Sequence, residues 1–347
     1  MRRLLFFLLV SMFLLVRVSL AATPITGCRG IGEPGEYYLT TDMINESFTC
    51  FIIFSNDVIL DCRGHIIDGN YEGMMNGIEA ENRTNITIKN CVLSNWDGAI
   101  WFDGVNNSRI VNTTVRYNWG GIVLPYSKYI TIENVTAIYN SNFGLSGGFS
   151  CGNWVIKNSV FKHNNYAVSV VASNNTLVYN NIFENNTHGL VIVDSSNVTV
   201  YNNLFNNTGE NVGFIRTIYP NSWNTTKTYG TNIVGGPYIG GNYWGYPNGT
   251  GYSDTCTDSD LDGICDSPYT LAANNIDYLP LTKFAPPQPP KKPTDFMKSI
   301  LGVGILVSFA AFVLSLISSP EISIEGLFKI IGILTAILIL ILTYGIL

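Results

Sequence analysis

Charged side chains are scarce in this sequence. Asp, Glu, Lys and Arg make up 13% of its 347 residues, about half the share of an average soluble chain. The formal net charge is −6 and no basic cluster interrupts the central part of the chain, which argues against a nucleic-acid partner. The whole chain has three His residues, so imidazole ligands for a metal ion are also few.

Asn takes the place of charge as the common polar residue. The chain contains 38 Asn, 33 Gly, 19 Tyr and 18 Phe. This composition disfavours helix and favours short strands and turns. It therefore excludes an ordinary helical bundle for most of the chain.

The N-terminus has the pattern of an export signal. Arg2 and Arg3 precede an apolar run over residues 4–16, and the small residues Ser19, Ala21 and Ala22 follow. This order predicts a secretory signal peptide over residues 1–22. An uncleaved membrane anchor is the alternative, because Arg17 interrupts the end of the apolar run.

The C-terminus contains two further apolar segments. Residues 284–297 include five prolines and predict an extended stalk. Residues 298–319 and 327–347 are each long enough to cross a bilayer as a helix, so we expect a two-helix transmembrane hairpin that anchors the protein in the cell membrane. A buried helical hairpin in a soluble domain is the alternative.

Cysteine usage is typical of an exported protein. Seven Cys are present without a CxxC metal spacing. We expect disulfides between Cys28 and Cys50 and between Cys256 and Cys265. A pair of Cys62 with Cys91 would leave Cys151 over, and buried free thiols are the alternative for these three. Twelve N-x-[ST] sequons also fit an exported glycoprotein.

The middle of the chain is a repeat. An Asn recurs at intervals of 22, 22, 24, 22 and 22 residues, with an apolar residue two positions before it and another three positions after it in nearly every copy. These are Asn90, Asn112, Asn134, Asn158, Asn180 and Asn202. A second series consists of Asn118, Asn140, Asn164 and Asn186.

A period of about 22 with short apolar alternation predicts one coil of a parallel β-solenoid per repeat. Asn suits the repeated turn because it tolerates the left-handed conformation and can bond its equivalent in the next coil. We expect an all-β chain with an N-terminal cap at 23–56, coils at 57–208 and a C-terminal cap at 209–283.

The segment after the coils resembles a known family. It reads "WNTTKTYGTNIVGGPYIGGNYWGYPNG" from Trp223 and "IDYLPL" from Ile276. These motifs are similar to NosD-type proteins, the periplasmic copper-binding protein family, and particularly to archaeal cell-surface members. The resemblance implies a right-handed parallel β-helix of the pectin-lyase-like kind. It also implies copper binding, since NosD proteins assist the assembly of nitrous oxide reductase together with a membrane transporter.

An acidic loop is the clearest metal-binding candidate. Residues 258–266 read "DSDLDGICD", with carboxylates alternating around a Gly turn. Oxygen ligands in this arrangement suit Ca²⁺, and the predicted ligands are Asp258, Asp260, Asp262, the carbonyl of Ile264, and Asp266. A solvated acidic loop is the alternative.

Copper ligands are not clustered in the repeat. His65, His163 and His188 fall in different coils, and His163 belongs to a series that also contains Tyr117 and Tyr139. We therefore expect no specific copper site, although the resemblance implies one.

Exposed aromatic residues are candidates for glycan binding. Tyr117, Trp119, Tyr139 and His163 could present rings to sugars, with Asn amides bonding the hydroxyls. The alternative is that these rings pack the coil corners.

No catalytic constellation is visible in the sequence. Asp97, Asp103, Glu133, Glu184 and Asp194 are scattered over several coils, so no residue is predicted to be catalytic.

We expect a cell-surface, membrane-anchored β-helix that binds carbohydrate or envelope glycan. A polysaccharide lyase or glycoside hydrolase is the first alternative, and a NosD-like accessory protein for copper-site maturation is the second.

Overall fold

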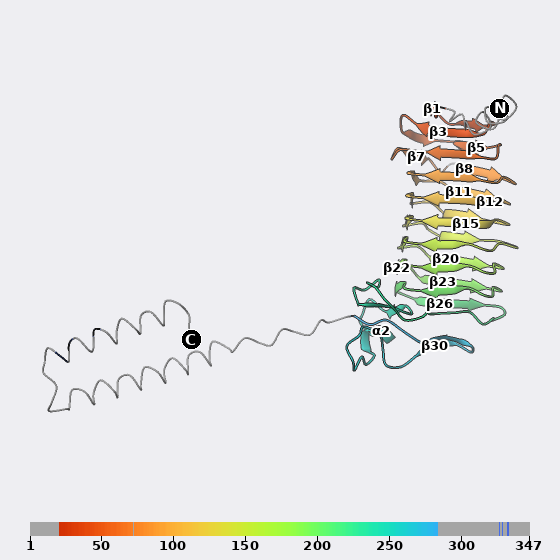
Figure 1. Ribbon diagram of the computed structural model, residues 1–347. Helices are drawn as coiled ribbons and strands as arrows, with labels where there is room; N and C mark the ends of the chain where they lie inside the picture. The colour runs from red at the N-terminus through yellow and green to blue at the C-terminus, as the bar shows by residue number, and fades with distance from the viewer. Residues whose placement is uncertain (1–20, 72, 284–325, 327, 329–331, 333–347) are drawn as a thin grey trace, which may run out of the picture. The chain divides into compact units, whose positions relative to one another are not determined.

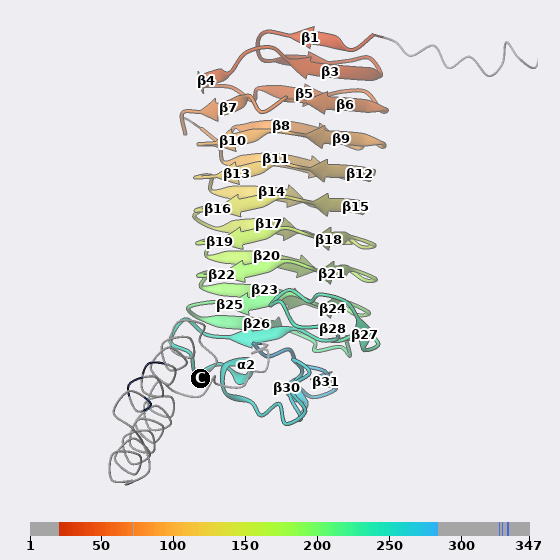
Figure 2. The same ribbon diagram turned by 60° about the vertical axis from the view of Figure 1, so that its left-hand side comes forward.

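The computed structural model describes residues 21–71 and 73–283, together with positions 326, 328 and 332. The chain divides into two compact units, Met1–Phe284 and Ala285–Leu347. The described part of the first unit is a stack of coils with a smaller irregular region after them (Figure 1 and Figure 2).

Three parallel sheets form the sides of the stack, each with nine strands. Sheet A consists, in spatial order, of β1 (Thr23–Ile25), β3 (Gly35–Leu39), β6 (Val58–Asp61), β9 (Ile86–Lys89), β12 (Asn106–Val111), β15 (Lys128–Glu133), β18 (Val155–Lys157), β21 (Leu177–Tyr179) and β24 (Thr199–Tyr201). Sheet B consists of β2 (Arg29–Ile31), β5 (Phe51–Ile53), β8 (Asn76–Glu81), β11 (Gly98–Asp103), β14 (Gly120–Leu124), β17 (Phe143–Gly147), β20 (Tyr166–Val171), β23 (His188–Val193) and β26 (Glu210–Ile215).

Sheet C consists of β4 (Met43–Glu46), β7 (Ile66–Gly69), β10 (Val92–Ser94), β13 (Thr114–Arg116), β16 (Thr136–Ile138), β19 (Val160–Lys162), β22 (Ile182–Glu184), β25 (Leu204–Asn206) and β29 (Tyr243–Gly245). The C-terminal region adds the antiparallel pair β27 (Thr228–Tyr229) and β28 (Tyr238–Ile239), the short helix α2 (Tyr252–Thr255), and the antiparallel pair β30 (Tyr269–Ala272) and β31 (Asn275–Asp277).

The repeat in the sequence is the coil of the structure. In each regular coil the chain passes from sheet A to sheet C to sheet B, and each strand pairs in parallel with its equivalent one coil later. Ile88, Ile110 and Ile132 lie side by side in sheet A, in the register that the 22-residue period predicts. The predicted right-handed parallel β-helix is therefore confirmed.

Apolar side chains of equivalent position fill the interior of the coils. Three Phe rings in sheet C stack directly on one another, with centroids 5.4 Å apart for Phe161 and Phe183 and 4.6 Å apart for Phe183 and Phe205. Trp244 continues the stack at 4.7 Å from Phe205. Because Trp244 lies in β29, the C-terminal region closes the last coil with an aromatic ring.

The N-terminal segment differs from its predicted role as a separate cap. Residues 23–56 form β1 to β5 and contribute strands to all three sheets, so the coils begin at Thr23. The turn Asn that marks later coils is absent here, and the Cys28–Cys50 disulfide joins this segment instead. Without the Asn marker, the repeat is not recognisable in the sequence.

The two Asn series behave differently. Asn90, Asn112 and Asn134 turn the chain between sheets A and C with φ of 57°, 50° and 53°, as predicted for left-handed turns. The second series, in contrast, does not occupy this conformation. Its members are buried and form a ladder in which the Asn118 amide donates to Asn140 Oδ1 at 3.0 Å and the Asn140 amide donates to Asn164 Oδ1 at 3.0 Å.

The predicted disulfides are present. Cys28 bonds Cys50 and Cys256 bonds Cys265. The third bond joins Cys62 and Cys91, and Cys151 is a buried free thiol.

Several predicted segments lie outside the described residues. They are positions 1–20 of the signal peptide, the stalk at 284–297, the first membrane helix at 298–319 and nearly all of the second at 327–347. Within the part of the chain that the structure describes, no helix is both long enough and apolar enough to span a bilayer.

Candidate functional site

A row of rings occupies the corner between sheets C and B. Tyr117, Tyr139 and His163, here called the first aromatic row, lie at equivalent positions of successive coils. Tyr117 and Tyr139 stack with centroids 5.4 Å apart, and Tyr139 and His163 with centroids 4.6 Å apart. The structure therefore brings together three of the four residues predicted to bind a ligand.

The backbone of the first aromatic row is left-handed. The φ angles are 55° at Tyr117, 57° at Tyr139 and 54° at His163. The equivalent residues of neighbouring coils are Asn95 and Asn185, which adopt the same conformation. Such a φ is uncommon for a bulky residue and is tolerated best by Gly and Asn. Tyr and His therefore occupy positions at which Asn is the favoured residue.

The polar ends of these rings face solvent. Tyr117 is 49% exposed and Tyr139 is 45% exposed. Within the described residues, the two hydroxyl groups and the imidazole of His163 form no hydrogen bond. Stacking covers the ring faces inside the row, so its outer side presents a column of hydrogen-bonding groups, one per coil.

Trp119 lies next to a neighbouring row of rings. Its ring packs edge-on against Phe143, with centroids 6.0 Å apart. Phe143, Tyr166 and His188, here called the second aromatic row, open strands β17, β20 and β23 of sheet B. Tyr166 and His188 stack at 4.6 Å, and His188 Nδ1 lies 3.8 Å from a Glu210 carboxylate oxygen.

Sequence reasoning missed the second aromatic row. The coil that contains Phe143 is longer than its neighbours, so the residues of this row follow one another at intervals of 23 and 22 residues. The row is marked in the sequence by a ring residue directly before the small residue that recurs at the start of these sheet B strands. The pairs are Phe143 with Gly144, Tyr166 with Ala167 and His188 with Gly189.

A shallow depression adjoins the end of the first aromatic row. Its volume is about 460 Å³, and it is lined by Tyr139, Asn140, Ser141, His163, Asn164, Asn165, Asn185 and Thr187. The ring stack ends here because the next equivalent residue, Asn185, carries no ring. The arrangement therefore offers an aromatic ring beside amides and hydroxyl groups.

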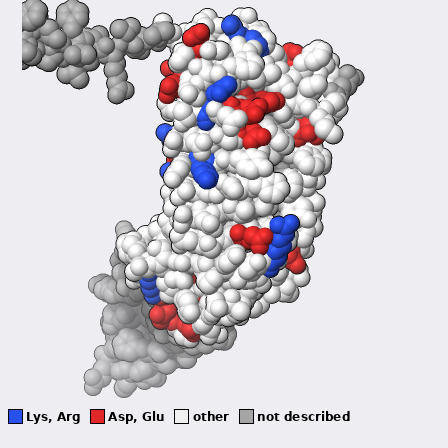
Figure 3. Space-filling view, turned by 90° about the vertical axis from the view of Figure 1, so that its right-hand side faces the viewer, with Lys and Arg blue, Asp and Glu red and all other residues white. Residues whose placement is uncertain are grey.

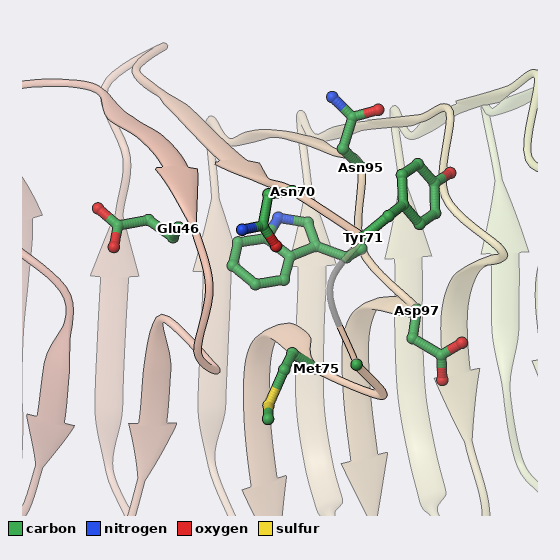
Figure 4. A pocket seen from close by; sticks show the side chains of 8 residues that line it. Glu46, Asn70, Tyr71, Met75, Asn95 and Asp97 are labelled. Atoms are coloured by element: carbon green, nitrogen blue, oxygen red, sulfur yellow. The ribbon is translucent and has the colours of Figure 1, made fainter.

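A second hollow at the other end of the row is closed. Figure 4 shows Asn70, Tyr71 and Asp97 around it, with Met75 and Glu46 on the opposite side. The Tyr71 hydroxyl donates a hydrogen bond to the Tyr117 carbonyl oxygen. The hollow leaves no room for a water molecule. Its side chains therefore pack the corner and do not form a ligand site.

Two carboxyl groups lie opposite each other on sheet B. Asp103 of β11 pairs in register with Glu81 of β8, and Trp101 pairs with Glu79 beside them. Burial and the nearby charge of Glu81 raise the pKa of Asp103. This pair is not recognisable in the sequence, because Glu81 and Asp103 belong to different coils and only the coil register brings them together.

Three of the four remaining carboxylates that were considered for catalysis form ion pairs, namely Glu133, Glu184 and Asp194. Glu133 lies 3.1 Å from Lys157, and Asp194 lies 3.3 Å from Arg216. Figure 3 shows that on one side of the stack charged side chains gather in a few groups with uncharged surface between them. These ion pairs neutralise the carboxylates locally and stabilise the surface of the sheets.

The acidic loop brings three of its predicted ligands together. Carboxylate oxygens of Asp258, Asp260 and Asp262 all lie within 4.8 Å of one another. Asp258 accepts hydrogen bonds from the backbone amides of Asp262 and Gly263, at 3.1 and 2.9 Å, which fixes the turn. The ammonium group of Lys227 contacts Asp262. Asp262 and Asp260 raise the pKa of Lys227 in turn, the hydrogen bond to Asp262 being the main cause.

The other two predicted ligands are placed differently. Asp266 accepts a hydrogen bond of 2.6 Å from the Ser259 hydroxyl and others from the Ser259 amide, which together lower its pKa. Ile264 forms an antiparallel bridge to Leu281. The Cys256–Cys265 disulfide joins the two ends of the loop.

The three His residues lie in separate surroundings. His65 Nδ1 lies 2.9 Å from Asp42, His163 stacks on Tyr139, and His188 stacks on Tyr166. Among the described residues, the acidic loop is the one place where three or more His, Cys, Asp or Glu side chains lie close enough together to hold a metal ion. Its hard oxygen donors suit Ca²⁺ rather than copper, so the residues present do not fit a copper site.

The family assignment comes from the sequence match. Residues 40–249 match the family described as "Periplasmic copper-binding protein (NosD)". The chain belongs to the NosD family. No curated protein matches the sequence.

Solved β-helix structures of low sequence identity are also similar to this NosD-family chain. The mannuronan C-5 epimerase AlgE4 A-module of Azotobacter vinelandii is 17% identical, with a TM-score of 0.41, over 58% of this chain and 57% of that one. Tailspike protein 2 of bacteriophage CBA120 is 11% identical, with a TM-score of 0.45, over 71% and 50%. Pectate lyase Pel9A is 12% identical, with a TM-score of 0.37, over 58% and 68%. The chain thus spans 57% and 50% of the length of the first two.

Proposed function

We propose that this NosD-family protein is an exported β-helix that binds glycan through the first aromatic row. The observation that carries the proposal is the column of stacked rings whose hydrogen-bonding groups point to solvent without a partner within the described residues. Sugars offer hydroxyl groups to such a column, and the ring at its end offers a stacking face.

The backbone supports a functional reason for these rings. A left-handed conformation costs a residue with a side chain about 1–2 kcal/mol, and Asn avoids part of this cost by local hydrogen bonding. Stacking between aromatic rings returns about 0.5–1.5 kcal/mol per pair. The two effects nearly cancel, so stability alone does not favour Tyr or His over the Asn of neighbouring coils. Strained positions that persist without a gain in stability are typical of functional sites.

The proposal places the β-helix outside the cell. Three disulfides are typical of proteins that fold in an oxidising compartment. The signal peptide at 1–22 would export the chain, and the segments at 298–319 and 327–347 would anchor it in the membrane. The sequons would carry glycans.

A binding screen tests the proposal. The purified protein is incubated with envelope and plant polysaccharides, and retention and the appearance of new chain ends are both measured. Tyr139→Asn and His163→Asn should reduce retention at least tenfold while preserving the turn. Tyr129→Asn is the matched control, because Tyr129 has φ of 57° and is 55% exposed near the start of β15 in sheet A. Retention that is equal in all variants would contradict the proposal.

A polysaccharide lyase or hydrolase is the second candidate function, and the Glu81–Asp103 pair favours it. Asp103, with its raised pKa, would act as the acid, and the Glu81 carboxylate would act as the base. In the same screen, Glu81→Gln and Asp103→Asn should abolish the formation of new ends, whereas Glu33→Gln should not. If wild-type protein binds polysaccharide without producing new ends, this second function is excluded.

We also propose that Ca²⁺ binds the acidic loop and orders the C-terminal region. Asp258, Asp260 and Asp262 would hold the ion, which supplies positive charge to a cluster that Lys227 now neutralises in part.

Chelation should lower the melting temperature by several degrees. Asp260→Asn should remove this effect of chelation, because it takes away one of the three proposed carboxylate ligands. The substitution should leave the fold intact, because the Asp260 side chain forms no hydrogen bond within the described residues. Lys227→Gln should tighten calcium binding in calorimetry, and absence of calcium heat in all three proteins would contradict the proposal.

A further inference from the structure

The two aromatic rows run side by side along the coils. Two polar residues, Asn164 and Asn165, separate His163 of the first row from Tyr166 of the second, and three, Asn140 to Asn142, separate Tyr139 from Phe143. The exposed residues between the rows are Ser141, Asn165 and Thr187, here called the polar strip. Their side chains form no hydrogen bond within the part of the chain that the structure describes.

Neither the rows nor the polar strip contain Asp, Glu, Lys or Arg. Around Tyr139, His163 and the second row the nearest charged groups have partners, whereas Arg116, directly before Tyr117, has no ion pair within the described residues. Lys162 lies 2.5 Å from Glu184 on sheet C, and Glu210 lies 3.8 Å from His188 at the end of the second row. Beyond the coil of Tyr117, a polymer with one carboxylate per sugar would have to be desolvated without a free cation to pair with each carboxylate, which is costly. The surface therefore suits an uncharged polymer with many hydroxyl groups.

The spacing of the coils sets the direction of such a polymer. Equivalent residues of successive coils are about 4.8 Å apart. An extended chain of β-1,4-linked sugars advances by nearly the same distance per sugar, so each sugar would meet the same set of side chains. A chain lying across the coils would meet charged residues of sheet C, such as Lys162.

We propose that the first aromatic row, the polar strip and the second aromatic row form one binding track for a neutral, extended polysaccharide that runs parallel to the stack of coils. This inference rests on the proposed glycan binding and adds the substrate class, the direction and the second row. Hydroxyl groups of Tyr117 and Tyr139 bond one side of the polysaccharide, and Tyr166 bonds the other. Ser141, Asn165 and Thr187 bond it from below.

One position on the track differs from the others. The first aromatic row ends at His163, where the depression of about 460 Å³ begins. The outer face of the imidazole has no ring stacked on it, because the next residue in the row is Asn185. A sugar ring stacks there, and Asn165 and Thr187 bond its hydroxyl groups. Trp119 marks the opposite end of the polar strip.

Calorimetry of the full-length protein with oligosaccharides tests this inference. The neutral probes are cello-, manno- and xylo-oligosaccharides of increasing length, and the acidic probes are oligogalacturonate and oligomannuronate. At least one neutral series should bind, with affinity rising with length until the track is filled. Acidic oligosaccharides should bind at least tenfold more weakly.

Substitutions separate the second row from the first. Tyr166→Phe, which removes a hydroxyl group and keeps the stack, should weaken binding severalfold, and Tyr166→Thr should weaken it at least tenfold. Tyr129→Asn in β15 of sheet A should bind like wild type. Melting curves show whether each variant is folded.

The outcomes distinguish the two proposals. If no probe binds, the proposed glycan binding and this inference both fail. If Tyr139→Asn weakens binding but both Tyr166 variants bind like wild type, glycan binding stands and the two-row track is overturned. Preference for the acidic probes overturns the neutral substrate class, even if both rows contribute.

Discussion

Ring residues in left-handed turns set the character of the candidate site at the scale of single residues. Tyr139 stacks on both neighbours of its row, and the equivalent position in other coils is Asn. The same residue thus bears an unfavourable backbone conformation and a favourable stack. Substitutions at this position separate the two effects.

Tyr139→Asn should change the free energy of unfolding by no more than about 1 kcal/mol, because the relief at the backbone offsets the lost stacking. Tyr139→Ala should destabilise the protein by about 1–2 kcal/mol, since Ala loses the stack and has no side chain to support the turn. Urea unfolding measures both. Equal destabilisation by Asn and Ala would show that backbone strain is negligible at this turn.

Asp277 makes the C-terminal region sensitive to pH. The carboxyl group is fully buried and accepts hydrogen bonds from the Asn242 amide at 2.8 Å and the Trp244 indole at 2.9 Å. Burial raises its pKa to about 7 from 3.8. Folding therefore favours the protonated form, and this stabilisation is complete below pH 3.8 and is lost as the pH rises through about 7.

The melting temperature should accordingly fall by at least about 3 °C between pH 5 and pH 8. Carboxylates with lowered pKa, such as Asp254, oppose this trend only near and below pH 4, because their stabilisation is lost as pH falls. Asp277→Asn should melt at a lower temperature, because the NH2 group of Asn would face N–H donors that now donate to the carboxyl group. The variant should also lose most of the dependence of the melting temperature on pH. If the melting temperature of Asp277→Asn changes with pH as much as that of the wild type, another group causes the pH dependence.

The buried Asn ladder is the feature that matters most at the scale of the coil. The Asn140 side chain accepts hydrogen bonds from the backbone and side-chain amides of Asn118, at 3.1 and 3.0 Å, and donates one to the Val115 carbonyl at 3.2 Å. It is 1% exposed. Each Asn thus satisfies polar groups of the preceding coil that water cannot reach.

Asn140→Ala should destabilise the protein by about 2–4 kcal/mol, because it leaves several buried donors and acceptors without partners. Asn142→Ala, two residues away with a side chain that forms no hydrogen bond within the described residues, should change stability by less than about 0.5 kcal/mol. Denaturant titration compares the two. Similar effects would mean that the ladder contributes packing and not hydrogen bonding.

Stacked coils govern the behaviour of the whole molecule. Each coil contacts mainly its two neighbours, so stability spreads along the stack from coil to coil. Trp244 and the C-terminal region cover the last coil, whereas β1, β2 and β4 are edge strands of the three sheets at the other end. The two ends of the stack are therefore unequal in protection.

Hydrogen exchange measured by mass spectrometry should reveal this inequality. Amides of β11 to β20 should exchange slowest, and protection should decrease toward β1 and β2 more than toward β26. Reduction of Cys28–Cys50 and Cys62–Cys91 should lower protection of the first coils further, since both bonds join neighbouring coils. Uniform exchange over all coils would indicate a single cooperative unit instead.

The sequence by itself determined the β-helix, its register and two of the three disulfides. A turn Asn every 22 residues with apolar residues at fixed offsets is local information, and the same interaction repeats in every coil. The acidic loop and the first aromatic row could be found for the same reason, because each is marked by spacing along the chain. The coils at 23–56 lack the Asn marker and were predicted as a separate cap.

Only the tertiary structure decided which surface residues become neighbours across coils of unequal length. The second aromatic row lies together because β17, β20 and β23 pair in register, and Glu81 meets Asp103 only through strand pairing. It also decided that Asn118, Asn140 and Asn164 are buried while Asn112 and Asn134 are exposed. The physical reason is that burial and cross-coil contacts depend on where the chain turns, and one or two inserted residues change that without changing the fold.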